Sequence, residues 1–192
     1  MKNKVKIFGI VIALLILIIL GVCVYFYFYK NDSTTLTATN ISINEGDYDY
    51  DFGDYEEILV KLDSVSDVYE ITDKGVYHFT GKLNGYIRIN TDKNVKIIFD
   101  GVIINNDNGP CIYVENAKNT YIELVGENNL TSGSDYSSEF LDIDGCIYSS
   151  DDLIFMGDGI LNVTSKYLDG IVSTDDLVFK SGTIPNHQKI LR

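Results

Sequence analysis

The fold is decided by two stretches that repeat each other, CIYSSDDLIF from Cys146 to Phe155 and GIVSTDDLVF from Gly170 to Phe179. The second starts 24 residues after the first, and a shorter echo, CIYVEN, runs from Cys111 to Asn116. Repetition at this spacing is typical of stacked repeats, because one unit cannot bury its apolar side alone. Functional residues are therefore expected in columns that cross the repeats.

Short apolar runs alternate with Gly, Asn and Asp turns from Val65 onward, and they show no helical period. Three such runs fill each repeat, and an insertion over residues 131–144 lengthens one of them. This pattern predicts an all-β parallel β-helix, a solenoid, because an antiparallel sandwich would not be self-similar at this spacing. The predicted strands are Ile58–Leu62, Tyr86–Ile89, Val95–Phe99, Val102–Ile104, Ile112–Val114, Thr120–Leu124, Ile147–Ser149, Leu153–Phe155, Leu161–Val163, Ile171–Ser173 and Leu177–Phe179.

Alternation of side chains along each strand predicts which residues point inward. Three interior columns are expected, the first of Ile87, Ile112, Ile147 and Ile171, the second of Ile97, Ile122, Phe155 and Phe179, and the third of Ile104, Leu130 and Leu161. The same alternation places Cys111 and Cys146 outside, one repeat apart, and side-by-side parallel neighbours seldom suit a disulfide. We therefore expect both as reduced thiols.

The N-terminus predicts a membrane anchor. Three lysines precede an apolar run of residues 7–29, which is long enough to cross a hydrocarbon core. Because positive charge favours the cytoplasmic side, residues 1–6 are expected inside the cell and the rest of the chain outside. A cleaved signal peptide, or lipidation at Cys23, are the alternatives. Residues 30–46, rich in Ser, Thr and Asn, are expected to be a linker.

The predicted exported part is strongly acidic. All 28 Asp and Glu residues follow Lys30, whereas four of the 15 basic residues lie at or before it, and the whole chain carries a net charge of −13. Nucleic acid and anionic membrane surfaces are therefore poor partners for it, while divalent cations or neutral surfaces suit it better. The stretch DYDYDFGD, residues 47–54, departs from a calcium-binding loop at its Gly and closing Glu positions, so we expect a solvated lead-in.

The acidic pairs of the repeat predict a calcium site. The turn after the first strand of each repeat is expected to align Asn116 with Asp151 and Asp175, and Ala117 with Asp152 and Asp176. Stacked carboxylates repel each other by roughly 3 kcal/mol at about 5 Å, and no Lys or Arg lies in these columns to offset this. Ca²⁺ would offset it, with Asp169 and Asp144 as further ligands. The alternative is that these aspartates cap turns.

An outward column on the first sheet is expected to contain Arg88, Tyr113, Tyr148 and Val172. Adjacent tyrosines on a flat face suit stacking against a sugar ring, although β-propensity alone also favours tyrosine on strands. No catalytic nucleophile with a base is apparent, and no Lys or Arg neighbours the acidic columns as a lyase base would. Glycoside hydrolysis by paired carboxylates has no support in the sequence either. His78 and His187 are expected to be ordinary packing or surface residues.

The repeat resembles that of a known family, on GVY at 75–77, GKLNGYI at 81–87, DGV at 100–102, GPCIYV at 109–114, NNLT at 128–131, the two Ser-x-Asp-Asp-Leu repeats and GDGIL at 157–161. This chain is similar there to the bacterial carbohydrate-binding domain of the cellulose- and pectin-binding β-helix type, over about residues 49–184. The resemblance implies a right-handed parallel β-helix outside the cell that carries calcium. It also implies binding of acidic or β-linked polysaccharide without established catalysis.

Together these observations predict a cell-surface, calcium-dependent polysaccharide-binding module, residues 47–184, behind one transmembrane helix at the cell membrane. A pectate-lyase-like enzyme and a surface adhesin or structural protein are the rivals. Residues 185–192 are basic, contain a proline and resemble no repeat, so we expect an aberrant tail that leaves the domain incomplete and its last repeat uncapped.

Overall fold

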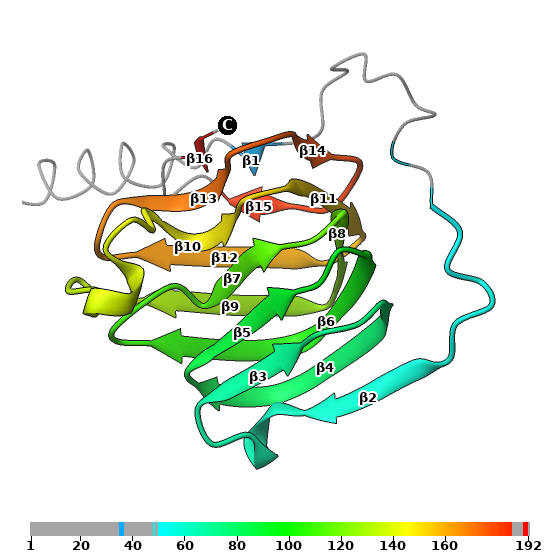
Figure 1. Ribbon diagram of the computed structural model, residues 1–192, viewed down its shortest axis with the longest axis horizontal. Helices are drawn as coiled ribbons and strands as arrows, with labels where there is room; N and C mark the ends of the chain where they lie inside the picture. The colour runs from blue at the N-terminus through cyan, green and yellow to red at the C-terminus, as the bar shows by residue number, and fades with distance from the viewer. Residues whose placement is uncertain (1–34, 37–47, 49, 186–189, 192) are drawn as a thin grey trace, which may run out of the picture. The chain divides into compact units, whose positions relative to one another are not determined.

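The computed structural model describes residues 35–36, 48, 50–185 and 190–191, which belong to one compact unit (Figure 1). In this part of the chain the structure is all-β and has two short 3-10 turns, η1 (Leu62–Ser64) and η2 (Ser138–Phe140), as its helical elements. No helix among the described residues is long and apolar enough to cross a membrane. The predicted anchor, residues 7–29, lies outside them.

Two parallel sheets and one short antiparallel pair make up the structure. The pair joins β1 (Thr35–Leu36) to β15 (Ile184–Pro185). The six-stranded sheet, whose strands lie one above another in Figure 1, contains in spatial order β16 (Ile190–Leu191), β13 (Asp169–Ser173), β10 (Gly145–Ser149), β7 (Ile112–Asn116), β5 (Tyr86–Asn90) and β3 (Val68–Ile71).

The eight-stranded sheet contains in order β12 (Ile160–Ser165), β9 (Glu127–Ser132), β6 (Asn94–Asn106), β8 (Asn119–Val125), β11 (Asp152–Gly157) and β14 (Leu177–Phe179). Alongside this path, β4 (Gly75–Asn84) pairs with β6, and β2 (Glu57–Lys61) pairs with β4. Strand β6 pairs with β8 through its first half and with β9 through its second half. The sheet therefore has two parts, one with β8, β11 and β14 and the other with β9 and β12, and the long strand β6 belongs to both.

Glycines in the left-handed region allow the long strands to change direction. Gly81 lies in β4 and Gly101 in β6, with φ of 87° and 66°, and the register of the β4–β6 pair shifts between Thr80 and Lys82. Only glycine adopts this conformation readily. The chain therefore bends here without ending the strand.

The fold-class prediction is corrected by these findings. A right-handed parallel β-helix of separate short strands, preceded by a transmembrane helix, is not what the described residues form. They form the six-stranded sheet, the bent eight-stranded sheet and the antiparallel pair, with no transmembrane helix among them. The sequence pattern located the strands, but it could not show that the predicted strands Val95–Phe99 and Val102–Ile104 would form one continuous strand, β6, through the bend at Gly101. The predicted strand positions themselves are confirmed, and β1, β3, β4, β9, β15 and β16 were missed.

Two of the three predicted interior columns are confirmed. Ladder pairing aligns Ile87, Ile112, Ile147 and Ile171, all fully buried. It also aligns Ile97, Ile122, Phe155 and Phe179, and the last two rings stack with centroids 5.1 Å apart. The third column is wrong in one member, because Val163 pairs with Leu130 whereas Leu161 pairs with Asn128.

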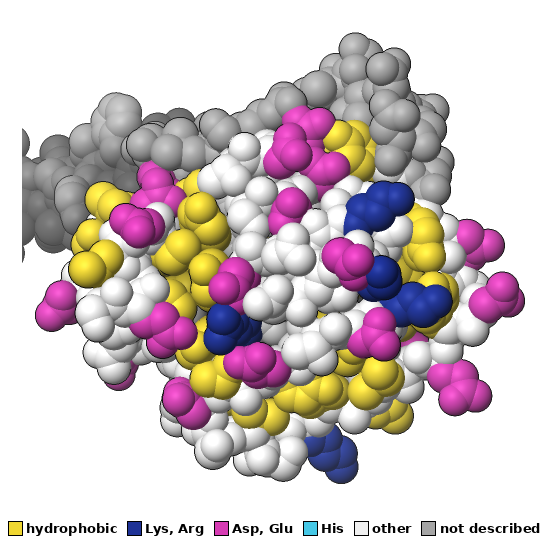
Figure 2. Space-filling model, in the orientation of Figure 1, with side chains coloured by type: hydrophobic (Ala, Val, Ile, Leu, Met, Phe, Trp, Pro, Cys, Tyr) yellow, Lys and Arg dark blue, Asp and Glu magenta, His cyan; other side chains and the backbone are white. Residues whose placement is uncertain are grey.

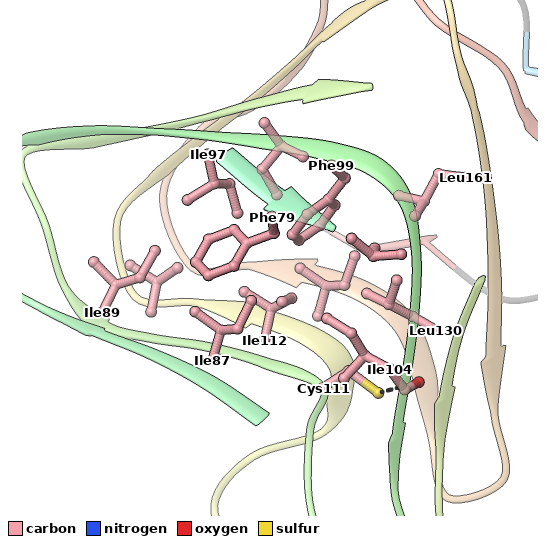
Figure 3. Close-up of a cluster of buried hydrophobic side chains, with 14 of the residues drawn as sticks. Phe79, Ile87, Ile89, Ile97, Phe99, Ile104, Cys111, Ile112, Leu130 and Leu161 are labelled. Atoms are coloured by element: carbon pink, nitrogen blue, oxygen red, sulfur yellow. Dashed lines mark hydrogen bonds between the residues drawn. The ribbon is translucent and has the colours of Figure 1, made fainter. Parts of the chain in front are cut away.

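The two cysteines point inward, contrary to the predicted outward position. Cys111 and Cys146 are fully buried free thiols, and the Cys111 Sγ donates to the Ile104 carbonyl at 3.5 Å (Figure 3). Cys111 lies just before β7, at the corner where the chain enters the six-stranded sheet. Strand alternation does not hold at such a corner, so both Cys111 and the next residue, Ile112, face the core.

Candidate functional site

The outer surface of the six-stranded sheet carries the predicted tyrosine column. Arg88 of β5 pairs in register with Tyr113 of β7, Tyr113 with Tyr148 of β10, and Tyr148 with Val172 of β13. The rings of Tyr113 and Tyr148 are tilted, with centroids 6.1 Å apart. We call Arg88, Tyr113, Tyr148 and the carboxylates beside Arg88 the tyrosine–arginine face. Figure 2 shows hydrophobic side chains gathered on this side of the molecule, next to basic and acidic ones.

Arg88 is held between two carboxylates. Its Nε and Nη2 donate to Glu115 Oε2 at 2.8 and 2.5 Å, and its Nη1 lies 3.5 Å from Glu70 Oε1. Asn90 also donates to Glu115, at 2.9 Å. The hydrogen bonds that Arg88 donates to Glu115 raise the pKa of Arg88, so the guanidinium stays charged. The face therefore presents fixed donors and acceptors beside two aromatic rings.

The insertion of residues 131–144 folds against this face. Phe140, which is buried, contacts the Tyr113 ring edge-on at 5.8 Å and the Tyr86 ring at 5.2 Å. Burial raises the pKa of Tyr113 and Tyr148, and burial together with Glu139 raises that of Tyr86 to about 12. These phenols are therefore protonated at neutral pH and can donate hydrogen bonds.

The six predicted calcium ligands fall into two groups at opposite ends of the strands. Asp144 and Asp169 lie where β10 and β13 begin, and the Asp169 N–H donates to the Asp144 carbonyl at 2.7 Å. The two Asp-Asp pairs, 151–152 and 175–176, lie beyond the other ends of the same strands. Because a strand rises about 3.3 Å per residue, the groups are roughly 20 Å apart and cannot share one ion.

The carboxylates of the Asp-Asp pairs already accept hydrogen bonds. Asp151 Oδ2 accepts from the Ala117 N–H at 2.9 Å, and Asp152 Oδ1 accepts from the Asp176 N–H at 3.0 Å. Asp176 Oδ2 accepts from the Tyr48 hydroxyl. Among the described residues no group of three or more His, Cys, Asp or Glu is placed to hold a metal ion. These contacts match the turn-capping alternative, and any cation here would need backbone carbonyls or water as further ligands.

The acidic column differs from its predicted alignment. Asp152 pairs in register with Asn119, and Asn119 with Asn94, so Ala117 is not in this column. With its amide oriented to satisfy both neighbours, Asn119 donates to Asp152 Oδ2 at 2.9 Å. Val114 pairs with Ser149 and Asn119 pairs with Asp152, so the chain between the paired positions is two residues longer in the earlier repeat than in the later one. A gapless alignment of the repeats could not reveal this.

A groove of about 830 Å³ lies on the eight-stranded sheet, where the sequence analysis predicted no site. The chain at Tyr48 and from Tyr50 to Tyr55 crosses the outer surface of β8 and β11, and Phe52 contacts the buried Tyr121 ring edge-on at 5.3 Å. The aromatic groove, as we call it, is lined by Tyr48, Tyr50, Asp51, Phe52, Gly53, Tyr55, Glu57, Val76, Lys96, Tyr121, Met156, Lys180 and Ser181. The alternating acidic and aromatic residues of 47–52, and the outward position of Tyr121 next to the inward Ile122, are the signals that could have indicated it.

His78 holds Glu57, one of the residues that line this groove. Its Nδ1 lies 2.9 Å from Glu57 Oε2 and its Nε2 lies 3.4 Å from Asp100 Oδ2, so the ring bridges β2 and β6. The hydrogen bond with Glu57 raises the pKa of His78, and that with Asp100 adds to the effect. The expectation of an ordinary surface histidine missed this bridge.

This bridge predicts pH-dependent stability. Because the folded pKa lies above the unfolded value, the protonated bridge stabilises the fold fully below about pH 6.5, and this contribution disappears as the pH rises through the raised folded pKa. Both carboxylates are about half exposed, so we expect His78→Gln to cost less than about 1 kcal/mol at pH 5.5 and nothing at pH 9. Urea unfolding at both pH values measures this, and a cost that does not change with pH would contradict it.

The sequence comparisons identify the family. The profile of the "Carbohydrate-binding domain-containing protein" family matches residues 66–187, more than half of the chain. The chain belongs to this family. A carbohydrate-binding domain-containing protein of Acetivibrio thermocellus is 34% identical over 124 residues, which cover 60% of this chain and 43% of that protein.

A solved structure shares the fold. The chain is similar to the polysaccharide lyase-like protein from C. thermocellum, solved as a gadolinium derivative, with a TM-score of 0.62 and 31% identity. The match covers 67% of this chain and 59% of that chain. This member of the carbohydrate-binding family therefore spans about half the length of the relatives it matches.

Proposed function

We propose that this carbohydrate-binding domain holds polysaccharide on its tyrosine–arginine face without cleaving it. The observation that carries the proposal is the in-register placement of Arg88, Tyr113 and Tyr148, with Glu115 and Glu70 beside them. Sugar-binding sites combine an apolar platform with a few fixed polar groups, and this face has both. Cellulose-like or pectin-like chains are the ligands that the family resemblance implies, and a position outside the cell stays a prediction.

Lyase activity is the alternative, because the structural neighbour is named polysaccharide lyase-like. Such a reaction needs a base that can take up a proton from the sugar. Arg88 is the basic residue of this face, but its pairing with Glu115 raises its pKa and keeps it protonated. This arrangement favours binding over elimination.

The binding surface can be tested with insoluble cellulose and with polygalacturonate. Tyr148→Ala should weaken binding about tenfold, as expected for loss of a central aromatic contact, whereas Tyr148→Phe should keep most of it. Thr164→Ala, an exposed position on β12, is the control and should bind normally. Formation of unsaturated uronide by the wild-type domain would establish the lyase alternative, and unchanged binding by Tyr148→Ala would remove this face from the proposal.

We also propose that calcium binds beside Asp152 and Asp176. The stacking of Asp152 on Asp176 and the gadolinium derivative of the structural neighbour support this. Millimolar calcium should raise the melting temperature relative to chelator, and the gain corresponds to about 2.7 kcal/mol at one hundred times the dissociation constant. Asp152→Asn with Asp176→Asn should remove the gain while the Asn oxygens keep accepting the turn hydrogen bonds. Identical melting curves of the wild type in calcium and in chelator would contradict the proposal.

A further inference from the structure

The aromatic groove has a wall that side-chain contacts hold in place. Tyr48 is tied to the sheet at both ends, because its hydroxyl donates to Asp176 and its carbonyl accepts from Lys180 Nζ at 3.0 Å. Phe52 rests on Tyr121, and the Phe52 carbonyl accepts from the Tyr55 N–H at 3.0 Å. The groove volume of about 830 Å³ falls within the roughly 300–1,000 Å³ of ligand pockets.

The lining has the chemistry of a sugar site. The Tyr50 ring contacts Phe52 edge-on at 4.7 Å, and the hydroxyls of Tyr50 and Tyr55 lie 3.1 Å apart. Tyrosine offers an apolar ring and a hydroxyl in one side chain, which suits a ligand with apolar C–H faces and many hydroxyls. Tyr50 is exposed, so a chain passing along the groove can reach it.

Charge in the groove favours an uncharged ligand. The ammonium of Lys96 lies 2.6 Å from Glu123 Oε2, and Lys180 donates to the Tyr48 carbonyl. Asp51 and Glu57 add two carboxylates to the lining, so its cations are balanced. An anionic polyuronate would meet no surplus positive charge, in a chain that is acidic overall.

We propose that the aromatic groove is a second polysaccharide site, which takes a neutral glycan chain. The proposal rests on the function proposed above and extends it, because the tyrosine–arginine face lies on the other sheet. A domain with a site on each sheet is bivalent. It can therefore bridge two polysaccharide chains, or bind one chain at both sites and gain avidity.

Titration of the chain with a soluble neutral oligosaccharide, cellohexaose, tests the second site by its stoichiometry. The wild type should bind two molecules, and Tyr50→Ala with Tyr55→Ala should bind one at unchanged melting temperature. The groove affinity should fall about tenfold or more. Tyr148→Ala should weaken the other site alone, and Thr164→Ala should leave both intact. Flocculation of a cellulose suspension should require both sites, although either alone supports binding.

The outcomes separate the two proposals. No binding of cellohexaose, cellulose or polygalacturonate by the wild type would overturn the function proposed for the domain as well as the second site, whereas binding of polygalacturonate alone would overturn only the second site. One bound molecule that is lost in Tyr148→Ala and kept in the double tyrosine variant would overturn the second site alone. Polygalacturonate competing for the groove would overturn the neutral ligand class.

Discussion

Replacing Ile147 with alanine is expected to lower the free energy of unfolding by about 2–5 kcal/mol. Ile147 is fully buried in the first interior column, where it lies in register between Ile112 below and Ile171 above. Truncation removes buried apolar surface and also leaves a cavity, because the stacked strands on both sides fix the positions of their side chains. Few other substitutions in this domain should cost as much.

Ile160→Ala is the matched control for this experiment. Ile160 begins β12 and is 38% exposed, so its truncation should cost no more than about 0.5 kcal/mol. Urea unfolding followed by circular dichroism measures both variants. Equal losses for the two would show that the stacked column does not dominate the stability of the repeats.

The interior could be predicted because it depends on a local rule. Strand alternation and the spacing of 24 residues were enough to align Ile147 with Ile171, and the shared opening CIY was enough to align Ile112 with Ile147. The rule fails near the start of a strand, as at the two cysteines, and where repeats differ in length, as over residues 114–119 compared with residues 149–152. It also failed for Leu161, because positions after a left-handed glycine are not fixed by counting from the preceding strand.

The candidate sites divide in the same way. The tyrosine–arginine face follows from alternation alone, since its residues are the outward partners of the first interior column. The salt bridges of Arg88 and the packing of Phe140 depend on side chains from distant segments. The aromatic groove exists because the segment of Tyr48 and residues 50–55, which precedes the first repeat, packs on β8 and β11. No repeat pattern specifies that contact.

The second large expected effect concerns Gly85, where β4 passes to β5. Its φ is 154°, and a Cβ there would lie 1.7 Å from the Asp67 carbonyl oxygen. That oxygen accepts a hydrogen bond from the Tyr86 N–H at 2.9 Å, while the Gly85 N–H donates to the Asn105 carbonyl at 2.8 Å. Two backbone hydrogen bonds therefore hold the chains at a distance that leaves no room for a methyl group.

Gly85→Ala should consequently cost more than about 3 kcal/mol, as strain in the left-handed region adds to a backbone clash. Gly101→Ala separates these two causes. Gly101 also has a positive φ, 66°, but a Cβ there would meet no atom within 4 Å, so only the conformational penalty of about 1–2 kcal/mol applies. Thermal and urea unfolding of both variants should rank Gly85→Ala well below Gly101→Ala. The reverse order would mean that the contact between Asp67 and Gly85 relaxes freely, and that the bend at Gly101 is the more constrained point of the repeat.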